Sequence, residues 1–139
     1  MKQILACFML FFSLSVYAAT TQNELITVMN GIENTWNRGD LNSFLTSYKN
    51  SDNTRYISTT IINGYPNIAK RYVEKYGSQQ KMGKLKFDIV EVKELSNQYA
   101  LVIGKYDLTR TNLPNAHGVF TLLFQKVGRE WKIIVDHTS

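Results

Sequence analysis

Residues 118–139 constrain the fold more than any other stretch of this chain. Residues 118–127 and 130–138 form two runs in which apolar and polar side chains alternate, and a short turn around Gly128 separates them. Such alternation is typical of β-strands that bury one face, and strands joined by a short turn pair antiparallel. Because the second run resembles a core strand, we expect the polar groups at the end of the chain, within residues 136–139, to lie at the rim or floor of a pocket.

Helices dominate the first half of the predicted domain. Thr21 and Glu24 have the spacing of a helix-capping box, and apolar residues then recur at helical spacing as far as Trp36. Asp40 is the expected cap of a second helix, and Pro66 fits the first turn of a third. After the first helix, the expected order is helix 41–48, a strand pair within 55–62, helix 66–76, a polar loop over 78–83, and strands 85–95, 99–110, 118–127 and 130–138.

The first 18 residues predict a signal peptide. Lys2 precedes an apolar run over residues 4–16, and residues 16–18 place small side chains where signal peptidase cleaves. The run is shorter than the ~20 apolar residues that span a bilayer. We therefore expect a mature domain, residues 19–139, in the periplasm or secreted, with no membrane attachment after cleavage.

Composition and spacing argue against several classes of site. Cleavage would remove Cys7, the only cysteine, so the mature chain would have no thiol nucleophile or cysteine–metal site. No histidine and carboxylate spacing suggests zinc, and no phosphate-binding loop is present, so neither a metal nor a cofactor is expected. Lys70, Arg71 and Lys75 share a predicted helix, but without a nucleic-acid motif they fit a solvated surface, and no nucleic-acid partner is expected.

Several short motifs follow one another along the whole mature chain. They are WNRGDL at 36–41, Gly64 before the third helix, LKFDI at 85–89, ALVIGKY at 100–106, GVFTL at 118–122, WKI at 131–133 and the terminal DHTS. This ordered set resembles the NTF2-like superfamily, and within it the DUF4440/SnoaL-like proteins.

The resemblance implies an α+β cone. In such a fold a bent antiparallel sheet, here of about six strands, wraps three helices from the N-terminal half, and a pocket opens between sheet and helices. These domains commonly dimerise through the sheet, so a homodimer is expected. The superfamily includes isomerases, cyclases, dehydratases and non-enzymatic association modules, so function must be argued from the site.

Aromatic residues on the predicted apolar faces are the candidates for a ligand pocket. We expect Trp36, Tyr48, Tyr56, Tyr76 and Tyr106 to line a cavity for a small apolar or aromatic molecule. The resemblance places Trp36 and Tyr56 near the cavity mouth. The alternative is ordinary core packing, with the tyrosine hydroxyls reaching the surface.

His137 is the candidate catalytic residue. If Trp131 and Ile133 face inward, strict alternation turns His137 into the pocket and Asp136 away from it. His137 could then act as a general base or a hydrogen-bond donor, or it could be a buried histidine that holds the strand end. Neighbours on a strand face opposite ways, so Asp136 cannot orient His137 and is expected to be structural.

The catalytic pattern of the ketosteroid isomerase-like relatives is not reproduced. Those proteins carry a tyrosine where this chain has Ile32 and, by register, a proton-shuttling aspartate at or near Tyr56; no carboxylate lies between Asn53 and Glu74. The leading hypothesis is therefore a binding protein without turnover. The alternatives are a weak isomerase, cyclase or hydrolase that uses His137, and a dimeric protein-interaction module.

Overall fold

Helices and a short strand pair occupy residues 21–82, and four long strands occupy residues 84–138. The computed structural model describes residues 20–139, so the predicted signal peptide lies outside the described residues. The elements are α1 Thr21–Asn37, α2 Leu41–Leu45, β1 Arg55–Ile57, β2 Ile61–Asn63, α3 Tyr65–Tyr76, α4 Gln79–Met82, β3 Lys84–Glu94, β4 Tyr99–Thr109, β5 Ala116–Val127 and β6 Glu130–Thr138. No helix within residues 20–139 is both long and apolar enough to cross a membrane.

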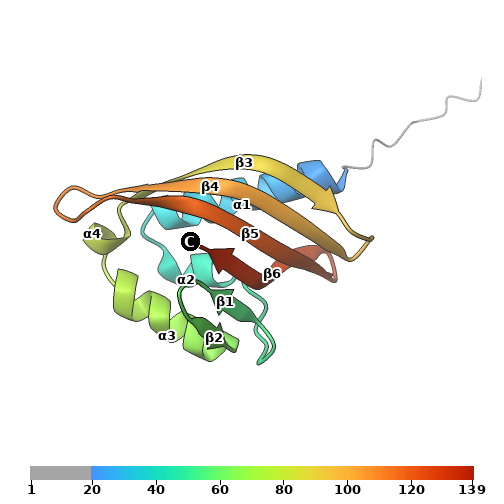
Figure 1. Ribbon diagram of the computed structural model, residues 1–139, viewed down its shortest axis with the longest axis horizontal. Coiled ribbons are helices and arrows are strands. Elements are labelled where there is room, and N and C mark those ends of the chain that lie inside the picture. Colours follow the sequence, from blue (N-terminus) through green and yellow to red (C-terminus); the bar gives the residue numbers. More distant parts are fainter. Residues whose placement is uncertain (1–19) are drawn as a thin grey trace, which may run out of the picture.

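All strands belong to one sheet with the order β2-β1-β6-β5-β4-β3. The antiparallel meander of β3 to β6 is as predicted. The exception to an antiparallel sheet is β1, which pairs parallel to β6 and so places the short β1–β2 hairpin beyond the last strand. The long strands arch over the helices (Figure 1), which confirms the predicted α+β cone with a bent sheet of six strands.

The first helix packs its apolar stripe against the concave face of the sheet. Leu25, Met29, Ile32 and Trp36 recur every three or four residues and are all buried. This spacing puts the four side chains on one face of α1, which contacts β3. Gly39 then takes a positive φ of 74°, a conformation that costs glycine little, and the chain turns into α2.

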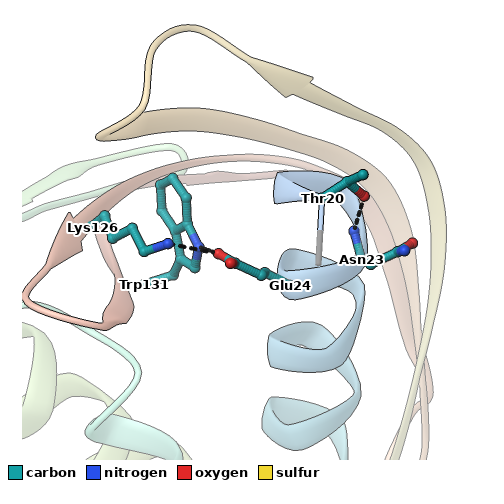
Figure 2. A network of polar contacts seen from close by, with 5 residues as sticks. All are labelled: Thr20, Asn23, Glu24, Lys126 and Trp131. Atoms are coloured by element: carbon teal, nitrogen blue, oxygen red, sulfur yellow. Dashed lines mark hydrogen bonds and ion pairs between the residues drawn. The ribbon is translucent and has the colours of Figure 1, made fainter. Parts of the chain in front are cut away.

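The start of α1 differs from the prediction. Thr20 caps the helix, because its Oγ1 accepts from the backbone N–H of Asn23 at 3.3 Å. Glu24 instead accepts from Trp131 Nε1 at 2.7 Å and from Lys126 Nζ at 2.9 Å (Figure 2). The predicted capping box is therefore wrong. The Trp131 hydrogen bond, with help from Lys126, lowers the pKa of Glu24 and ties α1 to the β5–β6 hairpin.

Two shorter segments also depart from expectation. Residues 78–83, predicted as a loop, contain the one-turn helix α4, whose N-cap Ser78 accepts from the N–H of Lys81 at 3.3 Å. The second helix ends at Leu45 rather than near Tyr48. Tyr48 instead forms a parallel bridge to Ile133 of β6, held by the N–H of Lys49 donating to the Ile133 carbonyl at 2.8 Å.

The last strand contains a β-bulge. Ile133 pairs with Phe124 of β5, but Val135 pairs with the adjacent Leu123, so Ile134 is an extra residue on β6. A bulge of this kind shifts the alternation of side chains by one. Beyond Ile134, side chains that strict alternation would turn inward therefore point outward, and their neighbours point inward.

Candidate functional site

A cavity of about 480 Å³ lies between the concave face of the sheet and helices α1, α2 and α3. Its volume falls in the range of small-molecule sites, roughly 300–1,000 Å³. Every long strand contributes to its wall, as does the β1–β2 hairpin. The wall is mostly aromatic and aliphatic, and its charged members are Arg71, Lys75 and Asp136.

The five aromatic residues predicted for a pocket all line this cavity. They are Trp36, Tyr48, Tyr56, Tyr76 and Tyr106. That they contact a ligand stays a prediction. Tyr72 of α3, another aromatic residue on the predicted apolar faces, also lines the cavity, with its ring centroid 5.9 Å from Tyr48 and 6.1 Å from Tyr56.

Trp36 anchors one wall of the cavity. Its ring meets Phe44 and Tyr76 edge to face, with centroid distances of 4.9 Å in both cases. Its Nε1 donates to the carbonyl of Met82 at 3.0 Å, a buried hydrogen bond between α1 and the end of α4. The indole is thus held by packing and by a satisfied donor, which fixes the shape of the wall.

His137 does not line the cavity. Its side chain is exposed on the outer face of the sheet, opposite Thr121 of β5. The prediction that His137 points into the pocket is wrong, because the bulge at Ile134 reverses the alternation before the strand end. The three consecutive apolar residues 133–135 interrupt the period of two and are the sequence signal of this change.

Asp136 occupies the inward position instead. Only 4% of its surface is exposed, and it lies beside Tyr56 of β1 and opposite Leu122 of β5, both buried. The prediction that Asp136 points away from the pocket is wrong for the same reason. A buried carboxylate therefore forms part of the mostly aromatic and aliphatic wall of the cavity.

A chain of hydroxyl groups leads to this carboxylate. Tyr48 Oη donates to Asp136 Oδ2 at 2.5 Å, and Thr138 Oγ1 donates to Asp136 Oδ1 at 2.5 Å. Tyr72 Oη lies 2.9 Å from Tyr48 Oη. An ionised carboxylate can only accept hydrogen bonds. The hydroxyl of Tyr48 therefore donates to Asp136, and the hydroxyl of Tyr72 donates to Tyr48. The bridge between Tyr48 and Ile133 positions the first tyrosine for this contact.

Burial changes the proton affinity of each member of this chain. It raises the pKa of Asp136 above its ordinary value, against the hydrogen bonds from Thr138 and Tyr48, which favour the charged form. Burial, followed by the nearby Asp136 charge, holds the pKa of both Tyr48 and Tyr72 well above the ordinary value. Both tyrosines therefore remain protonated donors at neutral pH.

The exposed end of the cavity, its mouth, is basic. Arg71 and Lys75 lie one turn apart on α3 and both line the cavity. The Arg71 guanidinium carbon lies 4.9 Å from the Tyr56 ring centroid, and Lys75 Nζ lies 5.2 Å from that of Tyr76. The expectation that these cations belong to an ordinary solvated surface overlooked their place at the cavity. Within residues 20–139, no group of three or more His, Cys, Asp or Glu side chains could hold a metal ion.

Comparison with known proteins assigns the family. No family model matches the sequence, and no curated protein matches it significantly. Among solved structures, an NTF-2-like protein of unknown function from Shewanella oneidensis MR-1 is 36% identical, with a TM-score of 0.81 over 86% of this chain and 99% of that one. The chain belongs to the NTF2-like family.

Other NTF2-like structures share the fold at lower identity. A ketosteroid isomerase-like protein from Erwinia carotovora atroseptica is 17% identical, with a TM-score of 0.64 over 86% of this chain and 97% of its own. An NTF2-like superfamily protein from Salmonella enterica serovar Typhimurium LT2 is also 17% identical, with a TM-score of 0.64 over 85% and 89% of the two chains. The resemblance to the NTF2-like superfamily is thus confirmed, while the narrower DUF4440/SnoaL-like assignment stays a prediction.

Proposed function

We propose that this NTF2-like domain binds a small, largely apolar or aromatic molecule in its cavity and does not transform it. The observation that carries the proposal is the cavity itself, about 480 Å³ of space walled mainly by aromatic and aliphatic side chains. Sites for small molecules combine such walls with a few convergent polar groups. Here the lining includes the polar groups of Tyr48, Tyr72 and Asp136 and the cations of Arg71 and Lys75.

The rigidity of the wall supports binding. Trp36, Phe44, Tyr72 and Tyr76 pack against one another with centroid distances between 4.9 and 6.4 Å. A ligand that enters such a cavity orders few side chains, so less of its interaction free energy is lost to conformational entropy.

The position of His137 favours binding without turnover over a reaction that uses this histidine. His137 is exposed on the outer face of the sheet and cannot reach a molecule in the cavity. Each oxygen of Asp136 already accepts a hydrogen bond from the protein, one from Tyr48 and one from Thr138. These bonds hold the carboxylate in place as part of the wall.

A cavity-filling variant tests the proposal. Leu122 of β5 is buried and lines the cavity, whereas Val127 at the end of the same strand is exposed and does not line it. We expect the neutral fluorophore N-phenyl-1-naphthylamine to bind the wild type at one site per chain. Leu122→Trp should weaken this binding by about tenfold or more, because the indole occupies the space that the probe needs.

Val127→Trp is the matched control, since it adds the same side chain to the same strand at an exposed position that does not line the cavity. It should leave the affinity for the probe within about twofold of the wild type. Fluorescence titration provides the dissociation constants, and circular dichroism checks that both variants are folded. The proposal fails if the wild type does not bind the probe, or if both variants bind it as the wild type does.

We also propose that the domain forms a homodimer through the outer face of the sheet. Leu101 and Ile103 of β4 alternate with the buried Ala100, Val102 and Gly104 and therefore face outward. Val119 of β5 is 55% exposed. Contiguous apolar surface of this kind favours association.

Light scattering after size-exclusion chromatography tests the homodimer. We expect the wild type to have the mass of a dimer, and Leu101→Glu/Ile103→Glu that of a monomer, because two buried, unpaired carboxylates would oppose the interface. Lys81→Glu, an exposed charge change on α4 and away from the sheet, should remain dimeric. A monomeric wild type would refute the proposal.

A further inference from the structure

Two cations face the cavity from one side of a single helix. Arg71 and Lys75 are four residues apart on α3, so their side chains project from the same face. Each lies against an aromatic residue of the wall, Arg71 over Tyr56 and Lys75 over Tyr76. These contacts hold both charges beside the mouth without neutralising them.

Neither cation has an acidic partner among residues 20–139. On the solvent side of the same helix, Lys70 pairs with Glu74 at 3.9 Å. The remaining salt bridges of the described residues involve Lys126 and Lys132, and none involves Arg71 or Lys75. The helix thus presents a paired charge to solvent and two unpaired positive charges to the cavity.

The side chains of the lining carry more positive than negative charge, with two cations and one acid. Ser58 and Thr59, from the turn between β1 and β2, add hydroxyl groups to the lining. The acid, Asp136, is attracted to Arg71 without forming a salt bridge with it, and both of its oxygens accept hydrogen bonds, from Tyr48 and Thr138. A negative group therefore finds donors at the mouth and apolar walls further in.

We propose that the ligand of this cavity is an organic acid whose aromatic or aliphatic body fills the cavity and whose anionic group lies between Arg71 and Lys75. This inference rests on the proposed binding function and narrows its ligand class. A guanidinium group matches the geometry of a carboxylate or sulfonate and can donate two parallel hydrogen bonds to it. A ligand amine at the same position would instead meet two like charges.

Two probes that differ by one charged group test this inference. They are 1-anilinonaphthalene-8-sulfonate and N-phenyl-1-naphthylamine, the same arylamine with and without a sulfonate. The wild type should bind the sulfonate about tenfold more tightly than the neutral probe. Added salt should weaken the binding of the sulfonate alone.

Arg71→Gln/Lys75→Gln should remove that preference. It should weaken sulfonate binding by about tenfold while the neutral probe binds within about twofold of its wild-type affinity. The control Lys70→Gln/Lys81→Gln removes the same number of charges from exposed positions that do not line the cavity. It should retain the wild-type preference.

The outcomes separate this inference from the function on which it rests. If both probes bind the wild type equally well and the Arg71/Lys75 variant changes neither affinity, the cavity binds ligands but the anionic class is wrong. If Leu122→Trp leaves sulfonate binding intact, the probe sits outside the cavity and the inference is also overturned. If neither probe binds, the proposed function itself has failed.

Discussion

Replacing Trp36 with alanine is expected to lower the free energy of unfolding by about 3–5 kcal/mol. The indole is 3% exposed and packs edge to face on Phe44 and Tyr76. Its removal would enlarge an existing cavity, since Trp36 already forms part of the wall. It would also leave the Met82 carbonyl without its indole donor.

Urea denaturation of Trp36→Ala, with Trp36→Phe beside it, measures this effect. The phenyl ring keeps part of the packing on Phe44 and Tyr76 but loses the hydrogen bond, so its cost should be clearly smaller than that of alanine. A loss below about 1 kcal/mol for Trp36→Ala would show that the indole is not the anchor of the wall.

Tyr48→Phe is expected to lower the free energy of unfolding by about 1–3 kcal/mol at neutral pH, because it leaves a buried carboxylate without one of its hydrogen-bond donors. Tyr48 is 3% exposed and donates to Asp136 Oδ2. Tyr72→Phe should cost less, since Tyr72 contacts Asp136 only through Tyr48, which keeps its own bond to the carboxylate. Equal losses in the two variants would contradict the proposed direction of the hydroxyl chain.

The effect of Tyr48→Phe should depend on pH. The pKa of Asp136 is raised in the folded state, so its contribution to stability is complete below the ordinary value of 3.8 and is lost as pH rises through the folded value. Phenylalanine removes a donor that favours the ionised form, which raises this pKa further. Unfolding free energies measured between about pH 4 and pH 8 should therefore show the variant losing more stability than the wild type as pH rises. Parallel curves would contradict this linkage.

The periodicity of the sequence predicted most of the fold. Leu25, Met29, Ile32 and Trp36 have the spacing of one helical face, and they form the buried stripe of α1. The alternating runs from residue 85 onward became β3 to β6 with boundaries that differ by one or two residues. These features depend on local pattern, which the sequence carries directly.

The candidate site was less predictable because one extra residue decides which side chains face the cavity. Trp131 and Ile133 point inward as expected, but the bulge at Ile134 exchanges the orientations of Asp136 and His137. The bulge forms where β6 meets both β5 and the segment around Tyr48, residues far apart in the sequence. The alternation of side chains along a single strand does not reveal such pairing between distant segments.

The same limit applies to Glu24. Its spacing from Thr21 suited a capping box, but the carboxylate is taken by Trp131 and Lys126, more than a hundred positions away in the chain. A local capping interaction and long-range hydrogen bonds compete for such a carboxylate. Here the long-range donors of the β5–β6 hairpin, Lys126 Nζ and Trp131 Nε1, bind it.

The proton affinity of Asp136 offers the most direct test of a ligand cavity with a buried carboxylate in its wall. The carboxyl carbon of Asp136 can be followed by NMR as pH is changed, with and without N-phenyl-1-naphthylamine. We expect a midpoint above the ordinary 3.8 in the free protein, and a higher one with the probe bound, because the probe displaces water from the cavity. A midpoint at or below 3.8 that the probe does not move would place the carboxylate in solvent and contradict the cavity site.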